Sequence, residues 1–234
     1  MKTKLPFNII YLESCSSTNT LLKEENYAFN TCLVTNEQTM GRGRLSRSFI
    51  STKGLGLYFS ILIDKSNYLN ILNKITCLVA SITRRAILKQ INCEVSIKWV
   101  NDIYINNKKV CGILTESKNN KLIIGIGINL YHQEFPSNIN ASSIEDEAKI
   151  RIDKDQLLKD LLEELNNIQN NQLDLMNEYI ANNLVIGKRV SLLINEKEVE
   201  VRVLGINSDG ELVINNNGKQ EQITSAIITK VSIL

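Results

Sequence analysis

The sequence has few of the residues on which metal and nucleophile chemistry depend. It contains one histidine, His132, and no two of its five cysteines form a CxxC pair, so the usual ligands of a zinc site are missing. Widely spaced cysteines in odd number are typical of reduced thiols in a cytosol. No Ser-His-Asp or Cys-His set is evident, and no phosphate-binding loop ending in Gly-Lys-Ser/Thr occurs.

Long apolar runs and an excess of charge are also missing. No stretch approaches the ~18 apolar residues of a membrane span, and the first residues lack the apolar region of a signal peptide. The 27 basic residues are offset by 25 acidic ones, which leaves a formal net charge of +2. Nucleic-acid-binding proteins usually carry a concentrated basic excess. We therefore expect a soluble, cytoplasmic protein with no membrane partner.

The composition allows a folded core, because 43% of the 234 residues are hydrophobic and 22% are charged. After residue 184 the pattern changes to short strands, in which valines alternate with charged residues over 198–203. Asp209-Gly210 and Asn217-Gly218 are hairpin signals. We predict a large domain, residues 1–184, followed by a small β-barrel domain, residues 185–234.

The most informative stretch, Thr39 to Phe49, contains two glycines and three arginines. Each guanidinium offers a rigid fork of donors for phosphate or carboxylate, and glycine lets the backbone approach a ligand. The stretch predicts a loop that closes over an anion; a solvated basic turn and a nucleic-acid patch are the alternatives. It lies between predicted strands 31–35 and 55–63, and the second is apolar almost throughout, as in a strand buried on both faces.

A polar cluster, Glu13 to Thr20, follows the predicted strand 7–12 and is mostly Ser, Thr and Asn. It should open a helix that ends near Tyr27. One such residue would suffice as an N-cap, so the alternative is that several of them line a site just past the strand end.

Lys98 lies near the end of a predicted strand, 95–102, on the opposite face from Ile97 and Trp99. Asn106-Asn107 then suits a hairpin turn. In the later strand, 121–130, two glycines and Asn129 share one face. Glycine weakens a strand unless something approaches its backbone closely, so we expect a ligand there, or alternatively a bulge or tight packing.

Helices are predicted from apolar residues that recur every three or four positions. One should run from Leu69 to Ala86, with Arg84-Arg85 on its solvated face. Residues 135–150 are polar and should form surface turns. Asp153 with Gln156 resembles a capping box, and two helices should follow it up to about Asn183.

These residues point to one site with several cationic and polar donors and no nucleophile. Its ligand should therefore carry a phosphate, a carboxylate, or both. Five motifs, in this order, resemble those of the biotin protein ligases: Ser17-Thr18-Asn19, Gln38 with Gly41-Arg42-Gly43-Arg44, Lys98-Trp99-x-Asn101-Asp102, Gly112-Ile113-Leu114-x-Glu116 and Gly125-Ile126-Gly127-Ile128-Asn129. Each motif is weak alone, but five in the family's order with similar spacing are specific, and the resemblance covers nearly the whole chain.

The resemblance implies an α+β fold: a mixed β-sheet flanked by helices, as in class II synthetases and biotin–lipoate ligases, with a small C-terminal SH3-like β-barrel. It also implies that biotin and MgATP give biotinyl-5′-AMP and pyrophosphate. Biotin would then pass to one lysine of a biotin carboxyl carrier domain, in acetyl-CoA carboxylase or a related carboxylase. No enzyme nucleophile is required, and no protein residue is assigned as a metal ligand.

Site residues are carried over from the motifs. Lys98, Arg42 and Arg44 would offset the charge that develops when the carboxylate attacks the α-phosphate. Biotin would be bound by Ser17, Thr18, Asn19, Gln38, Gly41, Arg42, Gly43, Arg44, Lys98, Gly112 and Leu114. ATP and the adenylate would be bound by Arg47, Phe49, Asn101 and Asn129. Asp102 would help deprotonate the acceptor lysine, orient Lys98, or simply end the strand.

Three positions depart from the family, which commonly has Gly, Trp and Pro where this sequence has Ser46, Phe49 and Val100. Phe49 offers less aromatic area than Trp and no indole N–H, so we expect adenylate retention to weaken by about 1 kcal/mol. Ser46 should stiffen the loop, and Val100 should change little.

Some relatives carry an N-terminal DNA-binding domain; the first predicted strand begins near Phe7, so we expect ligase activity without DNA binding. A homodimer through exposed sheet edges is a further option. The rival functions are a lipoate–protein ligase, disfavoured by the Gly-Arg-Gly-Arg loop and the barrel, and a nucleic-acid-binding protein, disfavoured by the small net charge.

Overall fold

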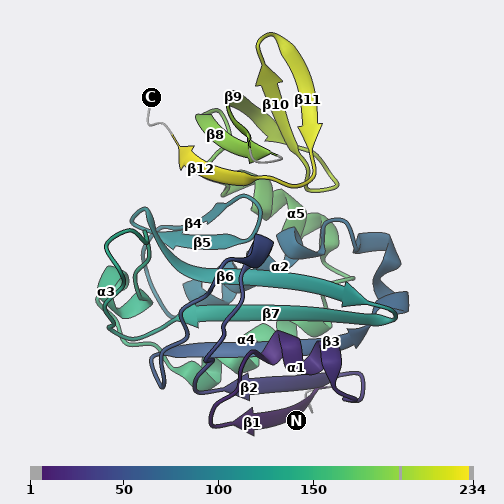
Figure 1. The fold of residues 1–234 in the computed structure, drawn as a ribbon, viewed down its shortest axis with the longest axis vertical. Helices are drawn as coiled ribbons and strands as arrows, with labels where there is room; N and C mark the ends of the chain where they lie inside the picture. Colours follow the sequence, from purple (N-terminus) through teal and green to yellow (C-terminus); the bar gives the residue numbers. More distant parts are fainter. Residues whose placement is uncertain (1–6, 195–196, 232–234) are drawn as a thin grey trace.

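The computed structural model describes residues 7–194 and 197–231, which form two β-sheets with helices around the larger one (Figure 1). The larger sheet has the strand order β1-β2-β3-β7-β6-β5-β4. β1 and β2 are parallel and the other neighbouring pairs are antiparallel, so the sheet is mixed, as predicted. Its strands are β1 (Asn8–Leu12), β2 (Thr31–Thr35), β3 (Gly56–Asp64), β4 (Val95–Lys98), β5 (Asp102–Ile105), β6 (Lys108–Lys118) and β7 (Lys121–Asn129).

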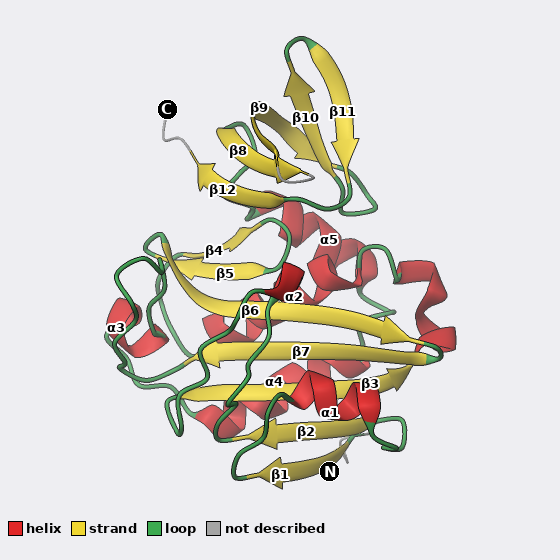
Figure 2. Cartoon of the chain, viewed as in Figure 1, coloured by secondary structure: helices red, strands yellow, loops and turns green. Residues whose placement is uncertain are grey.

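Apolar side chains bury β3 on both faces, which explains its nearly unbroken apolar sequence. Phe59 and Ile61 belong to the main core, whereas Leu62 packs in a small cluster with Leu22 and Leu33. The small cluster lies beneath α1 (Thr18–Glu24). The opposite face is covered by α2 (Ile75–Leu88), α4 (Lys154–Asn166) and α5 (Gln172–Ala181), which pack on one another behind the sheet (Figure 2). The face beside α1 is thus left for the arginine loop.

The predicted helix over Leu69 to Ala86 is wrong at its start. Residues Lys65–Ile71 form a 3-10 helix, η2, and α2 begins only at Ile75. The Asp64 side chain accepts a hydrogen bond from the backbone N–H of Ser66 and so caps η2. Leu69 is largely exposed, so its place in the apolar period was coincidental.

Arg84 and Arg85 do not lie on a solvated face, contrary to the sequence prediction. Nε of Arg84 donates to the carbonyl of Val95 at 2.7 Å, and its guanidinium pairs with Glu178 at 2.9 Å. Arg85 also pairs with Glu178, a residue of α5. The two arginines therefore tie α2 to α5 and to the start of β4.

Two local predictions after β7 have mixed outcomes. The segment 135–150 contains a short helix, α3 (Ile144–Ala148), that the sequence reading missed. Asp153 does cap α4, since its side chain accepts from the backbone N–H groups of Asp155 and Gln156. The reciprocal half of a capping box is replaced, because the Asp153 N–H donates to Gln90 and the Gln156 amide donates to Asp160.

The second sheet is antiparallel, with the order β11-β10-β9-β8-β12, and agrees with the expected SH3-like barrel. Its strands are β8 (Arg189–Ile194), β9 (Lys197–Ile206), β10 (Leu212–Asn216), β11 (Lys219–Ile223) and β12 (Ile227–Val231). Gly210, Asn217 and Gly218 have positive φ at the two predicted turns, as tight hairpins require.

The β9–β10 turn of the second sheet makes polar contacts with the β4–β5 turn and with the residues just before α2. Nε1 of Trp99 donates to the carbonyl of Gly210 at 2.9 Å, and the Asn73 amide donates to Asp209 at 2.7 Å. In the part of the chain that the structure describes, no helix is long and apolar enough to cross a membrane.

Candidate functional site

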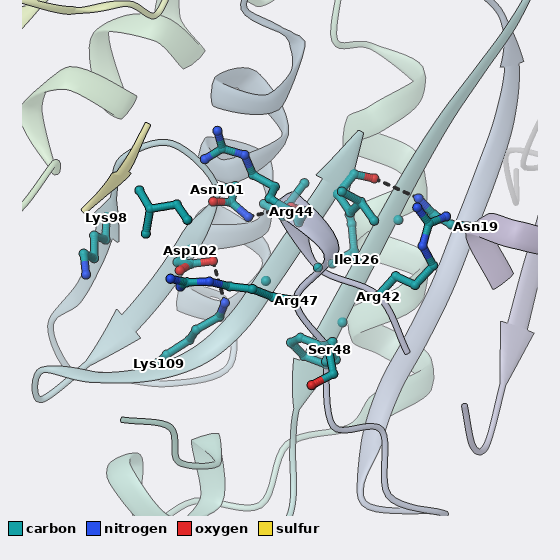
Figure 3. A pocket seen from close by; sticks show the side chains of 18 of the residues that line it. Asn19, Arg42, Arg44, Arg47, Ser48, Lys98, Asn101, Asp102, Lys109 and Ile126 are labelled. Atoms are coloured by element: carbon teal, nitrogen blue, oxygen red, sulfur yellow. Dashed lines mark hydrogen bonds and ion pairs between the residues drawn. The ribbon is translucent and has the colours of Figure 1, made fainter. Parts of the chain in front are cut away.

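A cavity of about 700 Å³ lies on the α1 face of the large sheet, beneath the arginine loop of residues 39–49 (Figure 3). This volume is within the range of about 300–1,000 Å³ that small-molecule sites occupy. β3, β6 and β7 supply its floor, the start of α1 and the β4–β5 turn supply two sides, and residues 226–229 of the second sheet supply another.

One end of the cavity is lined mainly by hydroxyl and amide groups that hydrogen-bond to one another, with the Arg42–Glu116 ion pair at its edge. Gln38 Oε1 accepts the backbone N–H of Thr18 at 2.9 Å, and its Nε2 donates to Ser51 Oγ at 2.8 Å. Thr18 Oγ1 lies 2.6 Å from Ser60 Oγ, which donates to Asn19 Oδ1 at 2.6 Å. These residues are held by α1, β3 and the loop after β2, so the polar cluster of the sequence faces into the cavity.

Ser17 lies at the same end. It is the N-cap residue of α1, yet within the described chain its side chain makes no capping hydrogen bond. A serine used only as a cap would accept a hydrogen bond from the first turn. The geometry therefore favours the site interpretation of the cluster from Glu13 to Thr20 over the simple N-cap.

The glycines of β7 do not leave the strand face bare. A Cβ added at Gly125 would overlap the Asn19 side chain, and one at Gly127 would lie 2.5 Å from Cε1 of the Phe49 ring. A Cβ at Gly112, on β6, would lie 3.1 Å from the same ring. The glycines thus let Asn19 and the Phe49 ring lie directly on the sheet, which is the tight-packing alternative.

The arginine loop is closed by its own backbone. The N–H of Phe49 donates to the Gly41 carbonyl at 2.9 Å, and the N–H of Gly43 donates to the Arg47 carbonyl at 2.7 Å. At the tip, Leu45 (φ 52°) and Ser46 (φ 60°) are both in the left-handed region. That conformation costs a residue with a side chain roughly 1 kcal/mol. The tip is therefore strained at the position where the family commonly has glycine.

The three loop arginines have different partners. Arg42 pairs with Glu116 at 3.3 Å, and Arg44 donates to Ser225 Oγ at 3.1 Å. Arg47 extends beside the Asp102 carboxylate (Figure 3). The loop is consequently attached to β6 and to the segment between β11 and β12, while Arg47 lies near the start of β5.

A charged cluster of lysines around Asp102 forms the other end of the cavity. Nζ of Lys109 lies 2.7 Å from Asp102 Oδ1, and it lies 5.9 Å from the centre of the Phe49 ring. Nζ of Lys98 donates to the carbonyl of Ile228 at 3.2 Å and lies 5.7 Å from the centre of the Tyr104 ring. This end can neutralise a ligand with more than one negative charge.

The pKa of Lys98 is lowered from its usual value. Burial is the main cause, and the charges of Lys109 and Arg47 act in the same direction, while Asp102 opposes them. An ammonium that is partly desolvated among other cations gains most from an anionic ligand, because the ligand supplies the missing counter-charge. The geometry of this end thus favours an anion over a neutral ligand.

The structure brings most of the predicted site residues together. The predicted residues that line the cavity are Ser17, Thr18, Asn19, Gln38, Arg42, Gly43, Arg44, Arg47, Phe49, Lys98, Asn101, Gly112 and Leu114. Gly41 and Asn129 do not line it. Gly41 is buried in the loop, where a Cβ would overlap the Phe49 carbonyl. The Asn129 amide donates to the carbonyl of Ser142 at 3.0 Å at the far end of β7.

Sequence reasoning missed Lys109, Ser60 and the segment 226–229. The pair Lys108-Lys109, a few residues before Gly112, was a usable signal for a second site lysine. Ser60 is the one polar residue within the apolar run of β3 from Gly56 to Ile63 apart from Tyr58, and it could have been noticed for that reason. The segment 226–229 carries no such signal, because the Lys98 contact uses a main-chain carbonyl.

The peptide bond between Trp99 and Val100, where the family commonly has proline, is cis. The Val100 carbonyl accepts a hydrogen bond from the hydroxyl of Tyr179 at 3.0 Å. Lys98 stays at the end of β4, so this departure leaves the site lysine where the motif requires it.

Among the described residues that line the cavity there is neither a cysteine nor a histidine. The fold and the site therefore define a class of protein in which a cationic loop covers a cavity on a mixed β-sheet, with lysines and hydrogen-bonding side chains in its lining. Charge compensation and positioning are the chemical means available to it.

Comparison with known proteins identifies the family. Residues 11–131 match the profile of the biotin/lipoate A/B protein ligase family, and residues 185–231 match the biotin protein ligase C terminal domain. Since the first match spans more than half of the chain, this protein belongs to the biotin/lipoate A/B protein ligase family, and within it to the biotin protein ligases.

Individual relatives agree with this assignment. The bifunctional ligase/repressor BirA of Bacillus subtilis is 34% identical over 167 residues, which cover 66% of this chain and 51% of that protein. The biotin--[acetyl-CoA-carboxylase] ligase of Mycobacterium tuberculosis is 25% identical, covering 80% and 74%. The structure of the biotin protein ligase from Aquifex aeolicus, in complex with biotin and ATP, superposes with a TM-score of 0.83 at 30% identity, covering 93% and 96%. This chain thus spans about half the length of the Bacillus relative.

Proposed function

We propose that this chain activates biotin with ATP and transfers it to a protein. Biotin and ATP would give biotinyl-5′-AMP and pyrophosphate, and one lysine of a biotin carboxyl carrier domain, in acetyl-CoA carboxylase or a related carboxylase, would then receive the biotin. The observation that carries the proposal is the polarity of the cavity. A neutral hydrogen-bonding network lies at one end and a cluster of cations at the other, as a neutral cyclic urea with a carboxylate tail, joined to a phosphate, would require.

The neutral end is proposed to bind the ureido ring of biotin. Ser17, Thr18 and Gln38 line it and offer hydroxyl and amide groups. Lipoate has an apolar dithiolane ring in place of the urea, so it would offer these groups no hydrogen bond. Sites built around hydrogen bonds reject analogues that lack the matching group by large factors. This end of the cavity therefore favours biotin over the lipoate alternative.

The cationic end is proposed to carry the first reaction. A carboxylate oxygen of biotin forms a bond to the α-phosphorus of ATP, and the bond from that phosphorus to the bridging oxygen breaks, releasing pyrophosphate. The two reactants repel because both are anionic. Lys98, Lys109 and Arg47 would hold them side by side and offset the charge that increases in the transition state. The arginine loop would exclude water, which otherwise hydrolyses an acyl-adenylate.

The second reaction requires no nucleophilic side chain from the enzyme. The acceptor amine attacks the acyl carbon, the bond to the phosphate oxygen breaks, AMP leaves and the amine loses a proton. Asp102 is the acidic residue among those that line the cavity. Because its Oδ1 is occupied by Lys109 and it faces Lys98, we assign it the role of orienting these lysines.

Mg²⁺ fits the site as a companion of ATP. Among the described residues no group of three or more His, Cys, Asp or Glu side chains could hold a metal ion. Mg²⁺ usually keeps several waters and binds mainly through substrate phosphates, so the phosphates of ATP would hold it in this cavity. Bound Mg²⁺ would stabilise charge on the departing pyrophosphate.

The finer organisation is also proposed. Residues 1–184 would form the catalytic biotin- and ATP-binding domain, and 185–234 the SH3-like domain. The five cysteines are free thiols, which supports a reducing, cytoplasmic location. A net charge of +2 supports the absence of DNA binding. β1 is an edge strand of the large sheet, so a homodimer through this edge is proposed, and sedimentation at several protein concentrations would test it.

The decisive experiment is transfer of labelled biotin to a purified carrier domain with MgATP. The proposal fails if the carrier receives lipoate and no biotin. Biotin-dependent exchange of pyrophosphate into ATP isolates the first reaction. Lys98→Ala should abolish most of this exchange while circular dichroism shows an intact fold; unchanged exchange would remove Lys98 from the site.

A further inference from the structure

The hydrogen bonds at the neutral end of the cavity have a fixed direction, which begins with Asn19. Its Nδ2 lies 3.2 Å from the carbonyl of Leu114 and 3.0 Å from the carboxylate of Glu116, and both of these groups can only accept. The amide nitrogen must therefore face them. The amide oxygen, Oδ1, is left facing Ser60, so the hydroxyl of Ser60 donates its proton to Asn19 at 2.6 Å.

The direction of the next bond follows from the single proton of each hydroxyl. Because Ser60 gives its proton to Asn19, the 2.6 Å contact between Thr18 Oγ1 and Ser60 Oγ can form only if Thr18 donates. The alternative acceptor for the Thr18 proton, Gln38 Oε1, is farther away at 3.2 Å and already accepts the Thr18 backbone N–H. With its proton used, Thr18 Oγ1 can only accept a hydrogen bond from a ligand.

Charge at the far end of the network reinforces this direction. Glu116 receives Nδ2 of Asn19 and pairs with Lys23 at 2.8 Å and with Arg42 at 3.3 Å. A carboxylate at the end of a hydrogen-bonded chain polarises each donor toward it, and the members of such a chain strengthen one another. The order Thr18 to Ser60 to Asn19 to Glu116 is thus the favoured one.

We propose that Ser60 is a positioning residue that holds Thr18 as an obligate acceptor, so that the site selects a ligand with a ring N–H at this point and rejects one with a ring oxygen. The inference rests on the proposed function, since the ring N–H is that of the biotin urea. Ser60 is fully buried on β3, and it acts on the ligand through Thr18. Gln38 has a fixed orientation as well, because its Nε2 donates a hydrogen bond to Ser51.

The probe is a pair of cyclic-carbamate analogues of biotin, in each of which an oxygen replaces one of the two ring N–H groups. The wild type should bind one of the two at least ~100-fold more weakly than biotin, because two acceptors would face each other. In Ser60→Ala, Thr18 is free to donate to the ring oxygen. We expect biotin to bind roughly tenfold more weakly, and we expect the rejection of that carbamate to shrink by about the same factor.

Ser81→Ala is the matched control. Ser81 is equally buried and makes one hydroxyl hydrogen bond, to the carbonyl of Leu175 at 2.7 Å, but it lies on α2 and does not line the cavity. It should leave the ratio of biotin to carbamate affinity unchanged. A loss of structure at Ser60 alone would weaken both ligands together, so only the ratio reports the direction of the Thr18 hydrogen bond.

The outcomes separate this inference from the proposed function. If the wild type does not bind biotin, the proposed function fails. If it binds biotin but tolerates both carbamates, or if Ser60→Ala keeps the wild-type ratio, the role of Ser60 is overturned and the ligase proposal stands. If Ser60→Ala does not fold, the wild-type measurement still tests the proposal, because tolerance of both carbamates would overturn it.

Discussion

The ring of Phe49 lies across Gly127 on β7, in a space that exists only because Gly127 has no side chain. A Cβ there would lie 2.5 Å from Cε1 of the ring. Gly127→Ala should therefore displace the ring and lower the free energy of unfolding by about 1–3 kcal/mol, as overpacking does. Because Phe49 also lines the cavity, the KM for ATP in pyrophosphate exchange should change as well.

Gly205→Ala provides the control for that substitution. Gly205 lies on β9, and a Cβ added there would meet no described atom within 4 Å. The Gly205→Ala variant should keep a thermal midpoint and a KM for ATP close to the wild-type values. Equal behaviour of the two alanine variants would mean that the ring does not depend on Gly127.

Lys109 should be as important for the first reaction as Lys98. Its ammonium lies 2.7 Å from Asp102 at the cationic end of the cavity. Removal of a group that stabilises transition-state charge typically lowers kcat by about 10²–10³, and we expect Lys109→Ala to lose pyrophosphate exchange on that scale. Lys108→Ala, which removes the exposed neighbouring lysine, should retain full activity. Wild-type exchange in Lys109→Ala would exclude the residue from the mechanism.

Ser46→Gly should stabilise the protein. Ser46 has a φ of 60°, which glycine adopts without a steric penalty, although glycine also gives the unfolded chain more freedom. We expect a net gain of up to about 1 kcal/mol, equivalent to a rise in the thermal midpoint of roughly 2–4 °C for a protein of this size. Ser48→Gly, at a residue without positive φ in the same loop, should lower the midpoint instead.

Glu116 should make stability depend on acidic pH. Burial acts to raise its pKa, but hydrogen bonds from Lys23 and Asn19 and the charge of Arg42 outweigh burial and hold the pKa below its usual value. A carboxyl group with a depressed pKa in the folded state stabilises the protein above the unfolded pKa, which is about 4.3 for glutamate. That contribution is lost as the pH falls below this value and through the folded pKa.

The comparison is between wild type and Glu116→Gln in urea unfolding at pH 7, 5 and 3.5. The wild type should be the more stable at pH 7, and the difference should shrink as the pH falls. Glu24→Gln, at an exposed position on α1, should show no such trend. A difference that is constant with pH would mean that the Glu116 ion pairs do not contribute through ionisation.

The fold was predicted best where local sequence rules determine the structure. The bounds of β2 were predicted to the residue, since a short apolar run between polar ends leaves little choice. The turn Asn106-Asn107 was also predicted, and both residues have positive φ. The errors depend on distant partners. Arg84 and Arg85 were misplaced because Glu178, the residue that neutralises them, lies 94 and 93 positions further along the chain.

The candidate site was predicted from the sequence where a motif itself contains the charged or hydrogen-bonding groups. The arginine loop, Lys98 and the Ser17–Asn19 cluster were found from residue type and spacing. The packing of Phe49 on two glycines could not be found in this way, because it depends on how the loop folds back over β6 and β7. Ser60 was hidden for a related reason: within a buried strand its meaning comes only from the two neighbours that it touches.

The carbonyl of Ile228 that receives Lys98 belongs to the main chain, and any amino acid at position 228 supplies the same oxygen. A substitution scan of residues 226–229 would report how the buried side chains of Ala226 and Ile228 pack in the core, but not the oxygen through which the segment contacts Lys98. Its contribution would emerge only when the backbone itself is altered, for example by an ester bond in place of the amide that follows Ile228. The response to side-chain change at this edge is thus no measure of what its main chain contributes to the cavity.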